Sequence, residues 1–180
     1  LGVAHLKDKV ISHFGDGRGY DLDIEYSVHT VKGGTGEGFR LAISWHVSEE
    51  IFFALNGDQI TDLDLRDLAD FHLEHDPTIT MAITKPRCPF GHVEVDGGHN
   101  VLGFLEKPAC PLTVCSAGIY VFNRQVLRYL PKKGDIEQTT LPSLARLHRL
   151  IAYLHDGLFV TINTPGDLER ANEDLGRLRL

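Results

Sequence analysis

The sequence is poor in cysteine and has no long apolar run. Its 180 residues include three cysteines, Cys88, Cys110 and Cys115, and no two of them form a CxxC pair. An odd number of cysteines without such a pair predicts reduced thiols and a cytoplasmic protein, not a disulfide framework. No run reaches the roughly 18 apolar residues that a membrane span needs, and residues 1–10 are charged where a signal peptide has its apolar core. We therefore expect neither a membrane protein nor a secreted, disulfide-rich domain.

The sequence also lacks a basic cluster. Lys and Arg total 18 against 25 Asp and Glu, which gives a formal net charge of −7. We expect no nucleic-acid partner, because binding to a phosphate backbone needs a stripe of Lys and Arg. A nucleotide or phosphate ligand remains compatible with this charge, because one pocket can be locally positive on an acidic protein. The sequence has neither a P-loop lysine motif nor a Gly-x-Ser-x-Gly elbow.

The apolar pattern predicts helices and strands that follow one another along the chain. Helical spacing predicts helices over residues 3–14, 39–45, 64–75, 125–130, 139–148 and 165–175. Apolar or alternating runs predict strands over residues 22–28, 51–55, 78–84, 117–122, 150–155 and 158–162, and a hairpin over residues 92–106. We therefore predict one α/β domain over residues 1–180, a three-layer sandwich with a Rossmann-like, mostly parallel sheet and an antiparallel hairpin insertion.

The strongest local signal for a site is Asn56-Gly57-Asp58, which directly follows the apolar run at residues 51–55. Such a run is typical of a strand buried on both faces, and ligands of open α/β sheets bind beyond the carboxyl ends of the strands. A carboxylate there can hold Mg²⁺, which takes one or two carboxylates together with phosphate oxygens. The alternative is that Asp58 only ends the strand through turn chemistry, and periodicity by itself favours that alternative.

Three other signals are weaker. Residues 33–38 form a glycine-rich loop, which either brings backbone N–H groups close to a ligand or is a mobile connector. Glu106-Lys107-Pro108 ends a hairpin strand; it offers an acceptor and a cation to a ligand, or is a solvated edge. His72 and His75 have a spacing that can ligate a metal, but no third ligand is near in sequence, and helix C-termini favour histidine anyway.

Taken in order along the chain, these motifs resemble one family. The matching segments are His5-Leu6, Gly34-Thr35-Gly36, Asn56-Gly57-Asp58-Gln59-Ile60, Phe71-His72, Phe90-Gly91-His92-Val93, Phe104-Leu105-Glu106-Lys107-Pro108, Ala117-Gly118-Ile119-Tyr120-Val121-Phe122, Ile136-Glu137 and Asn163-Thr164-Pro165-Gly166-Asp167-Leu168. The chain resembles the sugar-1-phosphate nucleotidyltransferases (nucleotide-sugar pyrophosphorylases), especially the mannose- and heptose-1-phosphate guanylyltransferases. Each segment is common by itself, whereas the ordered set is specific.

The resemblance implies an enzyme that transfers a nucleotidyl group from a nucleoside triphosphate to a sugar-1-phosphate and releases pyrophosphate. It places Asp58 on Mg²⁺ and makes Asp58 and Lys107 catalytic. It implies that the substrates are bound at Gly34, Thr35, Gly91, Glu106, Lys107, Ser116 and Gly118. The chemistry suits these positions, because in-line phosphoryl transfer mainly requires that two anions be positioned and their charge neutralised.

The chain departs from the family pattern at three places. The family's glycine-rich loop on the opening strand, with its Arg and Lys, is absent, so we expect an N-terminally incomplete domain and a natural protein that extends upstream of Leu1. Thr161 stands where the family has a second metal-binding Asp, and Ser116 stands where it has Asn. A neutral hydroxyl is a poorer Mg²⁺ ligand than a carboxylate, so Thr161 favours weakened metal binding.

Two alternatives to an active nucleotidyltransferase stay open. One is a non-catalytic relative that binds a nucleotide sugar as a regulatory or partner subunit, which Thr161 favours. The other is a glycosyltransferase, because Asp62-Leu63-Asp64 matches the Asp-x-Asp metal motif in its letters. The sequence does not identify the base of the nucleoside triphosphate or the sugar of the sugar-1-phosphate. By resemblance, Asn56-Gly57-Asp58 favours guanylyl transfer. The oligomeric state, a homo-oligomer included, is also left open.

Overall fold

The computed structural model describes residues 1–86, 92–105 and 113–175. The chain forms two compact units. The first consists of Leu1–Ala54, Ala69–Thr80 and Tyr120–Ile151, and the second of Leu55–Leu68, Met81–Ile119 and Ala152–Leu180. No helix among the described residues is long and apolar enough to cross a membrane.

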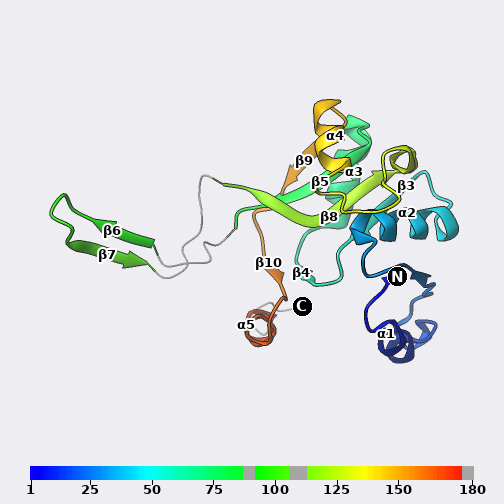
Figure 1. Cartoon of the computed structure of the whole chain (residues 1–180), viewed down its shortest axis with the longest axis horizontal. Helices are drawn as coiled ribbons and strands as arrows, with labels where there is room; N and C mark the ends of the chain where they lie inside the picture. The colour runs from blue at the N-terminus through cyan, green and yellow to red at the C-terminus, as the bar shows by residue number, and fades with distance from the viewer. Residues whose placement is uncertain (87–91, 106–112, 176–180) are drawn as a thin grey trace. The chain divides into compact units, whose positions relative to one another are not determined.

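The largest sheet has four strands, and three of them run in the same direction (Figure 1). Its order is β3 (Ile51–Leu55), β8 (Cys115–Asn123), β5 (Ile79–Thr84) and β9 (Leu150–Leu154). The backbone hydrogen bonds Arg124 N to Glu50 O and Asn56 N to Gly118 O make β8 antiparallel to β3. The predicted α/β architecture with a mostly parallel sheet and antiparallel strands is confirmed.

The β5–β9 pair provides the parallel pairing of this sheet. The amide of Thr78 donates to the carbonyl of Arg149, and the amide of His155 donates to the carbonyl of Ile83, so both strands advance together along the chain. The amide of Asn123 donates to the carbonyl of Thr78, which joins the end of β8 to the start of β5 and makes that pair antiparallel. β8 is therefore the one reversed strand among the four.

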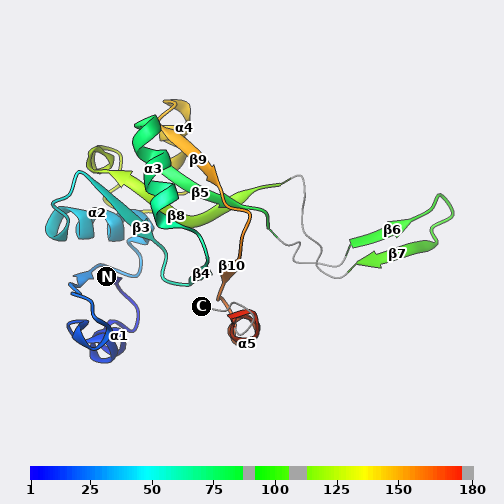
Figure 2. The ribbon, with the colours of Figure 1, turned by 180° about the vertical axis from the view of Figure 1, so that it is seen from behind.

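Helices cover both faces of the sheet within the first unit. The Asn123–Thr78 bond places Val121 opposite Thr80, so Thr80 and Phe122 lie on opposite faces of the sheet. Phe122 contacts Phe39 of α2 (Gly34–His46) with ring centroids 5.5 Å apart. Thr80 contacts His72 of α3 (Leu65–His75), which lies on the other side of the sheet in the reverse view (Figure 2). The layers are thus helix, sheet and helix.

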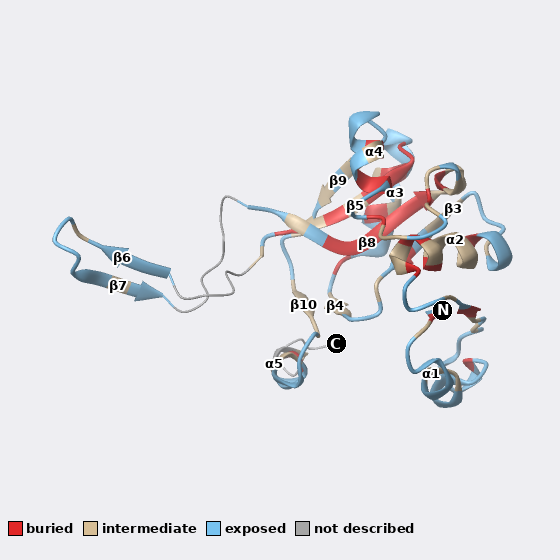
Figure 3. Cartoon of the chain, viewed as in Figure 1, coloured by how far each residue is buried: buried red, intermediate tan, exposed pale blue. Residues whose placement is uncertain are grey.

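The core of the molecule follows β8. Every residue of β8 from Ala117 to Phe122 is buried, whereas Cys115 and Asn123 at the two ends of the strand are half-buried and Ser116 is exposed (Figure 3). Tyr120 and Phe122 are 1% and 0% exposed, and the ring of Phe52 packs edge-on against Phe122. Truncation of such a buried aromatic side chain costs about 3–5 kcal/mol. The apolar run in the sequence therefore identifies the central strand correctly.

The remaining elements are short. They are β1 (Gly2–Val3), α1 (Lys7–Phe14), a 3₁₀ turn η1 (Arg18–Tyr20), β2 (Ser27–Val28), β4 (Gln59–Thr61), the hairpin β6 (His92–Val95) and β7 (Val101–Leu105), a 3₁₀ turn η2 (Arg124–Arg128), α4 (Thr140–Arg146), β10 (Phe159–Thr161) and α5 (Pro165–Leu175). In α5 the amide of Asp167 donates to the hydroxyl of Thr164, so the predicted N-cap is confirmed.

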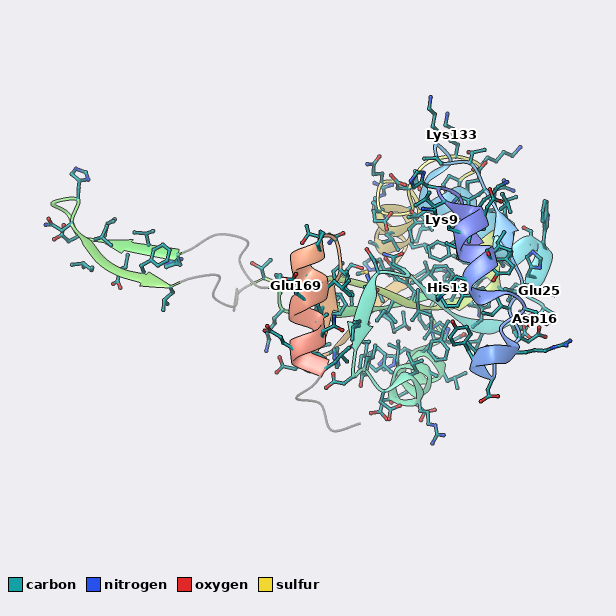
Figure 4. All side chains as sticks on the ribbon, turned by 90° about the horizontal axis from the view of Figure 1, so that it is seen from below. Lys9, His13, Asp16, Glu25, Lys133 and Glu169 are labelled. Atoms are coloured by element: carbon teal, nitrogen blue, oxygen red, sulfur yellow. The ribbon has the colours of Figure 1, made fainter. Side chains whose placement is uncertain are left out.

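Two predictions near the N-terminus are wrong. The helix predicted over residues 3–14 begins at Lys7, because Val3 is buried in β1 and pairs in parallel with Val28 of β2. Of the strand predicted over residues 22–28, only Ser27–Val28 is a strand. α1 itself contains no buried residue, and Lys9 and His13 stand on its surface (Figure 4). Its apolar spacing therefore indicates the helix but not its starting point.

The prediction of a glycine-rich loop over residues 33–38 is also wrong, because the residues from Gly34 onward form the first turn of α2. A Cβ on Gly36 would lie 2.6 Å from the carbonyl oxygen of Gly134, and Gly34 has a φ of +74°. The amide of Gly36 donates to Gly134 O, and the amide of Gly134 donates to Gly33 O. These glycines are needed because two backbone segments approach each other too closely for side chains.

Candidate functional site

The turn after β3 presents Asp58 to solvent. β3 ends at Leu55, and the amide of Asn56 donates to the carbonyl of Gly118, which holds the start of the turn against β8. Gly57 and Asp58 are exposed. Within the part of the chain that the structure describes, the Asp58 carboxylate makes no hydrogen bond or ion pair. Turn chemistry by its side chain therefore does not explain Asp58, and the carboxylate is available to a ligand.

A short antiparallel ladder brings Thr161 beside this turn. β4 pairs with β10 over three positions, with Gln59 opposite Thr161 and Thr61 opposite Phe159. The ladder continues one step further, because the amide of Ile162 donates a 2.8 Å hydrogen bond to the carbonyl of Asp58. Thr161, where the family resemblance leads us to expect a second Asp, is thus the cross-strand neighbour of Gln59, which directly follows Asp58.

This donor set suits Mg²⁺ held mainly by a substrate. It provides the exposed carboxylate of Asp58 and the hydroxyl of the half-buried Thr161. Among the described residues there is no group of three or more His, Cys, Asp and Glu side chains that can hold a metal ion. Mg²⁺ is commonly bound through one or two carboxylates while phosphates and water fill the other positions. The residues fit such a site and do not fit a cage built by the protein alone.

Side-chain amides converge on Gly118 next to this turn. Gly118 has a φ of +66°, and a Cβ there would lie 2.5 Å from Nδ2 of Asn56 and closer still to Nε2 of Gln59. The amide of Gly118 donates a 3.1 Å hydrogen bond to the hydroxyl of Ser116. Among the described residues, Oε1 of Gln59 is buried and has no hydrogen-bond partner. Of the predicted site residues, the structure brings Asp58, Ser116 and Gly118 together in one unit.

Asn56 and Gln59 are site residues that sequence reasoning did not single out. Both flank Asp58 in the same motif, and this adjacency is the one signal that the sequence offers for them. Only the positive φ of Gly118 and its lack of a Cβ show that the two amides point at β8. The sequence contains no local cue for that approach, because β8 lies far along the chain.

Gly34 and Thr35 are engaged with another part of their own unit. The amide of Thr35 donates to Oδ1 of Asp135 at 3.1 Å, and its hydroxyl donates to Oε2 of Glu137 at 2.9 Å. The same hydroxyl accepts a 3.0 Å hydrogen bond from the amide of Ile136. The Asp135 carboxylate therefore lies at the N-terminus of α2, the positive end of the helix dipole. An anionic ligand of this helix would bind most favourably at the same place.

The other predicted residues have varied outcomes. Gly91, Glu106 and Lys107 lie outside the described residues. The hypothesis of a metal site at His72 and His75 is not supported, because Nδ1 of His72 bonds to the buried hydroxyl of Thr80 at 2.8 Å and Nδ1 of His75 bonds to a backbone carbonyl.

The Asp-x-Asp pattern at residues 62–64 is occupied by structural contacts. Oδ1 of Asp62 lies 3.0 Å from Nε2 of His155. Oδ1 of Asp64 accepts a 2.7 Å hydrogen bond from the amide of Arg66 and so caps the start of α3. Both carboxylates therefore have structural partners, and no group of three or more possible metal ligands surrounds them among the described residues, so the structure does not support the Asp-x-Asp hypothesis.

The fold and the site together define a class: an α/β protein with an exposed carboxylate at the carboxyl end of a sheet strand, where ligands of this architecture bind. A family model described as "Nucleotidyl transferase" matches residues 3–158. The chain therefore belongs to the nucleotidyl transferase family, in the group of sugar-1-phosphate nucleotidyltransferases. The resemblance inferred from the ordered motifs is confirmed.

The related sequences carry nucleotidyltransferase names. A mannose-1-phosphate guanylyltransferase of Mycobacterium tuberculosis is 30% identical over 184 residues, which cover 98% of this chain and 51% of the relative. A mannose-1-phosphate guanylyltransferase catalytic subunit beta of Drosophila pseudoobscura pseudoobscura is 33% identical, over 81% of this chain and 41% of the relative. A glucose-1-phosphate cytidylyltransferase of Salmonella typhi is 29% identical, over 74% and 52%. The chain thus spans about half the length of these relatives.

Solved structures share the fold. HddC from Yersinia pseudotuberculosis, in a crystal structure of its complex with GMP-PN, matches with a TM-score of 0.71 and 19% identity, over 97% of this chain and 77% of that one. A putative glucose-1-phosphate thymidylyltransferase from Bacillus anthracis matches with a TM-score of 0.70 and 19% identity, over 98% and 74%. At this identity the likeness establishes the architecture.

Proposed function

We propose that the protein that carries this chain transfers a nucleotidyl group from a nucleoside triphosphate to a sugar-1-phosphate, with release of pyrophosphate. The single observation that carries the proposal is the exposed Asp58 carboxylate, which has no partner among the described residues and lies in a turn that is held on one side by Gly118 and on the other by Ile162. The family membership and the nucleotidyltransferase names of the relatives support it.

Asp58 is proposed to hold Mg²⁺ together with phosphate oxygens of the substrates, and the hydroxyl of Thr161, which lies opposite Gln59 on the paired strand, is proposed to assist it. When bound, Mg²⁺ neutralises charge at the reacting phosphates. The phosphate oxygen of the sugar-1-phosphate attacks the α-phosphorus in line, and pyrophosphate leaves. The residues of the chain mainly position the two anions for this step.

The side chains around Gly118 are proposed to bind the sugar. The amides of Asn56 and Gln59 and the hydroxyl of Ser116 are neutral hydrogen-bonding groups gathered within one unit, and such groups match sugar hydroxyls. Gly91, Glu106 and Lys107 are proposed to complete this site, with Lys107 donating to a phosphate oxygen. Gly34 and Thr35 are proposed to border the nucleoside, with the inner side of Thr35 fixed by Glu137.

We further propose that the product is a GDP-sugar and that mannose-1-phosphate is an acceptor. This finer proposal rests on relatives named mannose-1-phosphate guanylyltransferase, which cover more of the chain than the relative named for cytidylyl transfer. Cytidylyl transfer to glucose-1-phosphate is the competing specificity, so the test includes it.

The test supplies the purified protein with Mg²⁺, each nucleoside triphosphate in turn, and mannose-1-phosphate or glucose-1-phosphate, and follows pyrophosphate. We expect release with GTP and mannose-1-phosphate, and a loss on the order of 100-fold or more in kcat for Asp58→Asn. The matched control is Asp70→Asn, which makes the same chemical change at an exposed position on α3. Turnover that Asp58→Asn leaves intact contradicts the proposal, as does saturable binding of a nucleotide sugar without any turnover.

A further inference from the structure

A half-buried histidine lies at the junction between β9, β10 and β4. The side chain of His155 is 11% exposed, and its Nε2 lies 3.0 Å from Oδ1 of Asp62. The same nitrogen lies 3.2 Å from the hydroxyl oxygen of Thr61 and 3.1 Å from the carbonyl oxygen of Leu158. A carboxylate and a carbonyl can only accept, so Nε2 carries a hydrogen and is the donor.

This arrangement does not build a nucleophile. A carboxylate–imidazole–hydroxyl relay uses both ring nitrogens, with the carboxylate on one and the hydroxyl on the other. Here the carboxylate of Asp62 and the hydroxyl of Thr61 share Nε2. The contacts of His155 therefore hold segments of the chain together and do not activate Thr61.

The segments that His155 joins are the two strands of the short ladder and the turn between β9 and β10. Thr61 ends β4, and Leu158 directly precedes β10. The amide of His155 donates to Ile83 in β5, so its own backbone is fixed to a longer strand. A Cβ on Gly157 would overlap the Asp62 carboxylate, which shows how closely the turn packs against β4.

The ladder needs such a fixed point because it is short. β4 and β10 have three residues each, and none of their residues is fully buried. Burial of one face normally specifies the register of a strand pair, and a slip of one residue moves every side chain to the other face. The His155 contacts lie at one end of this ladder, while Asp58 and Thr161 lie at the other.

We propose that His155 is a positioning residue that sets the register of β10 on β4 and so keeps Thr161 beside Asp58. The inference rests on the proposed function only for its catalytic consequence, since the register itself can be measured without turnover. Through the register, His155 acts on the affinity for the divalent cation and not on the chemical step.

The test compares His155→Ala with His155→Gln, whose side-chain amide can supply an N–H near the position of Nε2. Hydrogen exchange of the Ile162 amide, which bonds to Asp58 O, reports the register, and the Asn56 amide, which bonds to Gly118 O, is the internal reference. We expect exchange at Ile162 to rise by at least about tenfold in His155→Ala, with little change at Asn56 and with protection restored in His155→Gln. Binding of Mn²⁺, followed by electron paramagnetic resonance, should weaken in parallel.

Each outcome decides one proposal. Unchanged exchange at Ile162 in His155→Ala overturns the positioning role, whether or not the protein is an enzyme. If exchange at Ile162 rises in His155→Ala but the wild-type protein shows no turnover, the positioning role is supported and the proposed function is contradicted. In the active enzyme, the apparent KM for Mg²⁺ should rise while kcat at saturating Mg²⁺ is retained; a loss confined to kcat overturns the inference. Where His155→Ala fails to fold, Asp62→Ala removes one of the three acceptors and gives the same comparison.

Discussion

The hydroxyl of Thr35 lies 2.9 Å from Oε2 of Glu137, so a carboxylate from a distant part of the chain holds the first turn of α2. The same hydroxyl accepts from the amide of Ile136, and the Thr35 amide donates to Asp135. Three hydrogen bonds at one residue tie α2 to the segment before α4. The start of α2 is therefore part of the packed structure, and its predicted contact with a nucleoside involves at most its outer side.

Replacement of Thr35 by Val tests this role. The substitution removes the donor to Glu137 and leaves the amide of Ile136 without its acceptor, so we expect the free energy of unfolding to fall by about 1–3 kcal/mol. Thr35→Ser keeps the hydroxyl and should cost less than about 0.5 kcal/mol. Denaturant unfolding at constant m-value measures both. If Thr35→Val keeps wild-type stability but binds nucleotide more weakly, the Thr35 hydroxyl contacts the ligand and does not stabilise the fold.

Gly34 should not tolerate a side chain. Its φ is +74°, and a Cβ would lie 2.6 Å from the carbonyl carbon of Gly134 and 2.5 Å from Oδ1 of Asp135. Because backbone atoms cannot move away cheaply, Gly34→Ala should destabilise the protein by about 2 kcal/mol or more. Gly57→Ala is the matched control, since no heavy atom lies within 4 Å of its Cβ position. Thermal unfolding compares the two, and equal midpoints contradict the close approach of the two segments.

His72 should make stability depend on pH. It is buried, Nδ1 bonds to Thr80, and Nε2 has no partner among the described residues. Burial lowers the pKa of His72 from its ordinary 6.5, while the Asp76 carboxylate raises it to a smaller extent. Below pH 6.5 the unfolded chain takes up this proton before the folded chain does, so stability is full above pH 6.5 and is lost as the pH falls through and below it.

The measurement is the free energy of unfolding of the wild type, His72→Gln and His75→Gln between pH 5 and pH 8. We expect the wild type and His75→Gln to lose stability together on acidification, whereas His72→Gln loses less. His75 is the matched control because it lies on the same helix and is exposed. Parallel pH profiles for all three proteins contradict a contribution from His72.

Thr161→Asp should strengthen metal binding. The ladder places Thr161 opposite Gln59 and next to Asp58, so an added carboxylate there can join Asp58 on one cation. We expect the affinity for Mn²⁺ or Mg²⁺ to rise on the order of tenfold, because ligand charge is a main determinant of affinity for such cations. Thr161→Asn, of similar shape and without charge, is the control. Titration calorimetry that finds equal affinities for the two variants places Thr161 away from the metal.

The sequence was most informative where a pattern reflects local physics. The apolar run at residues 117–122 identifies β8, whose residues Ala117 to Phe122 are buried on both faces. The run at residues 51–55 identifies β3 as a strand, but the prediction that it is buried on both faces is wrong, because Phe53 and Leu55 are exposed. Gly97-Gly98 between two alternating runs predicts the hairpin that β6 and β7 form. Thr164 before Pro165 predicts a helix start that the Asp167 amide confirms. Each of these cues lies within a few residues of the element that it describes.

The same reasoning was wrong where a distant segment decides the local structure. The glycine-rich pattern at residues 33–38 predicts a flexible loop, whereas contact with Gly134 makes Gly34 and Gly36 part of a helical turn. The spacing of Val3 predicts a helix, whereas pairing with Val28 places Val3 in a strand. Neither partner can be identified from the residues around the misassigned position.

The order of the longer helices and strands, the buried strand β8 and the acidic turn at Asp58 follow from the sequence alone, because periodicity and turn chemistry act between neighbouring residues. Only the tertiary structure decided that Ile162 bonds to the Asp58 carbonyl, that Thr161 stands opposite Gln59, and that the amides of Asn56 and Gln59 meet over Gly118. Strand register and the close approach of backbones depend on hydrogen bonds and burial between segments far apart in the chain. The acidic turn is thus a property of the sequence, and the site around it is a property of the fold.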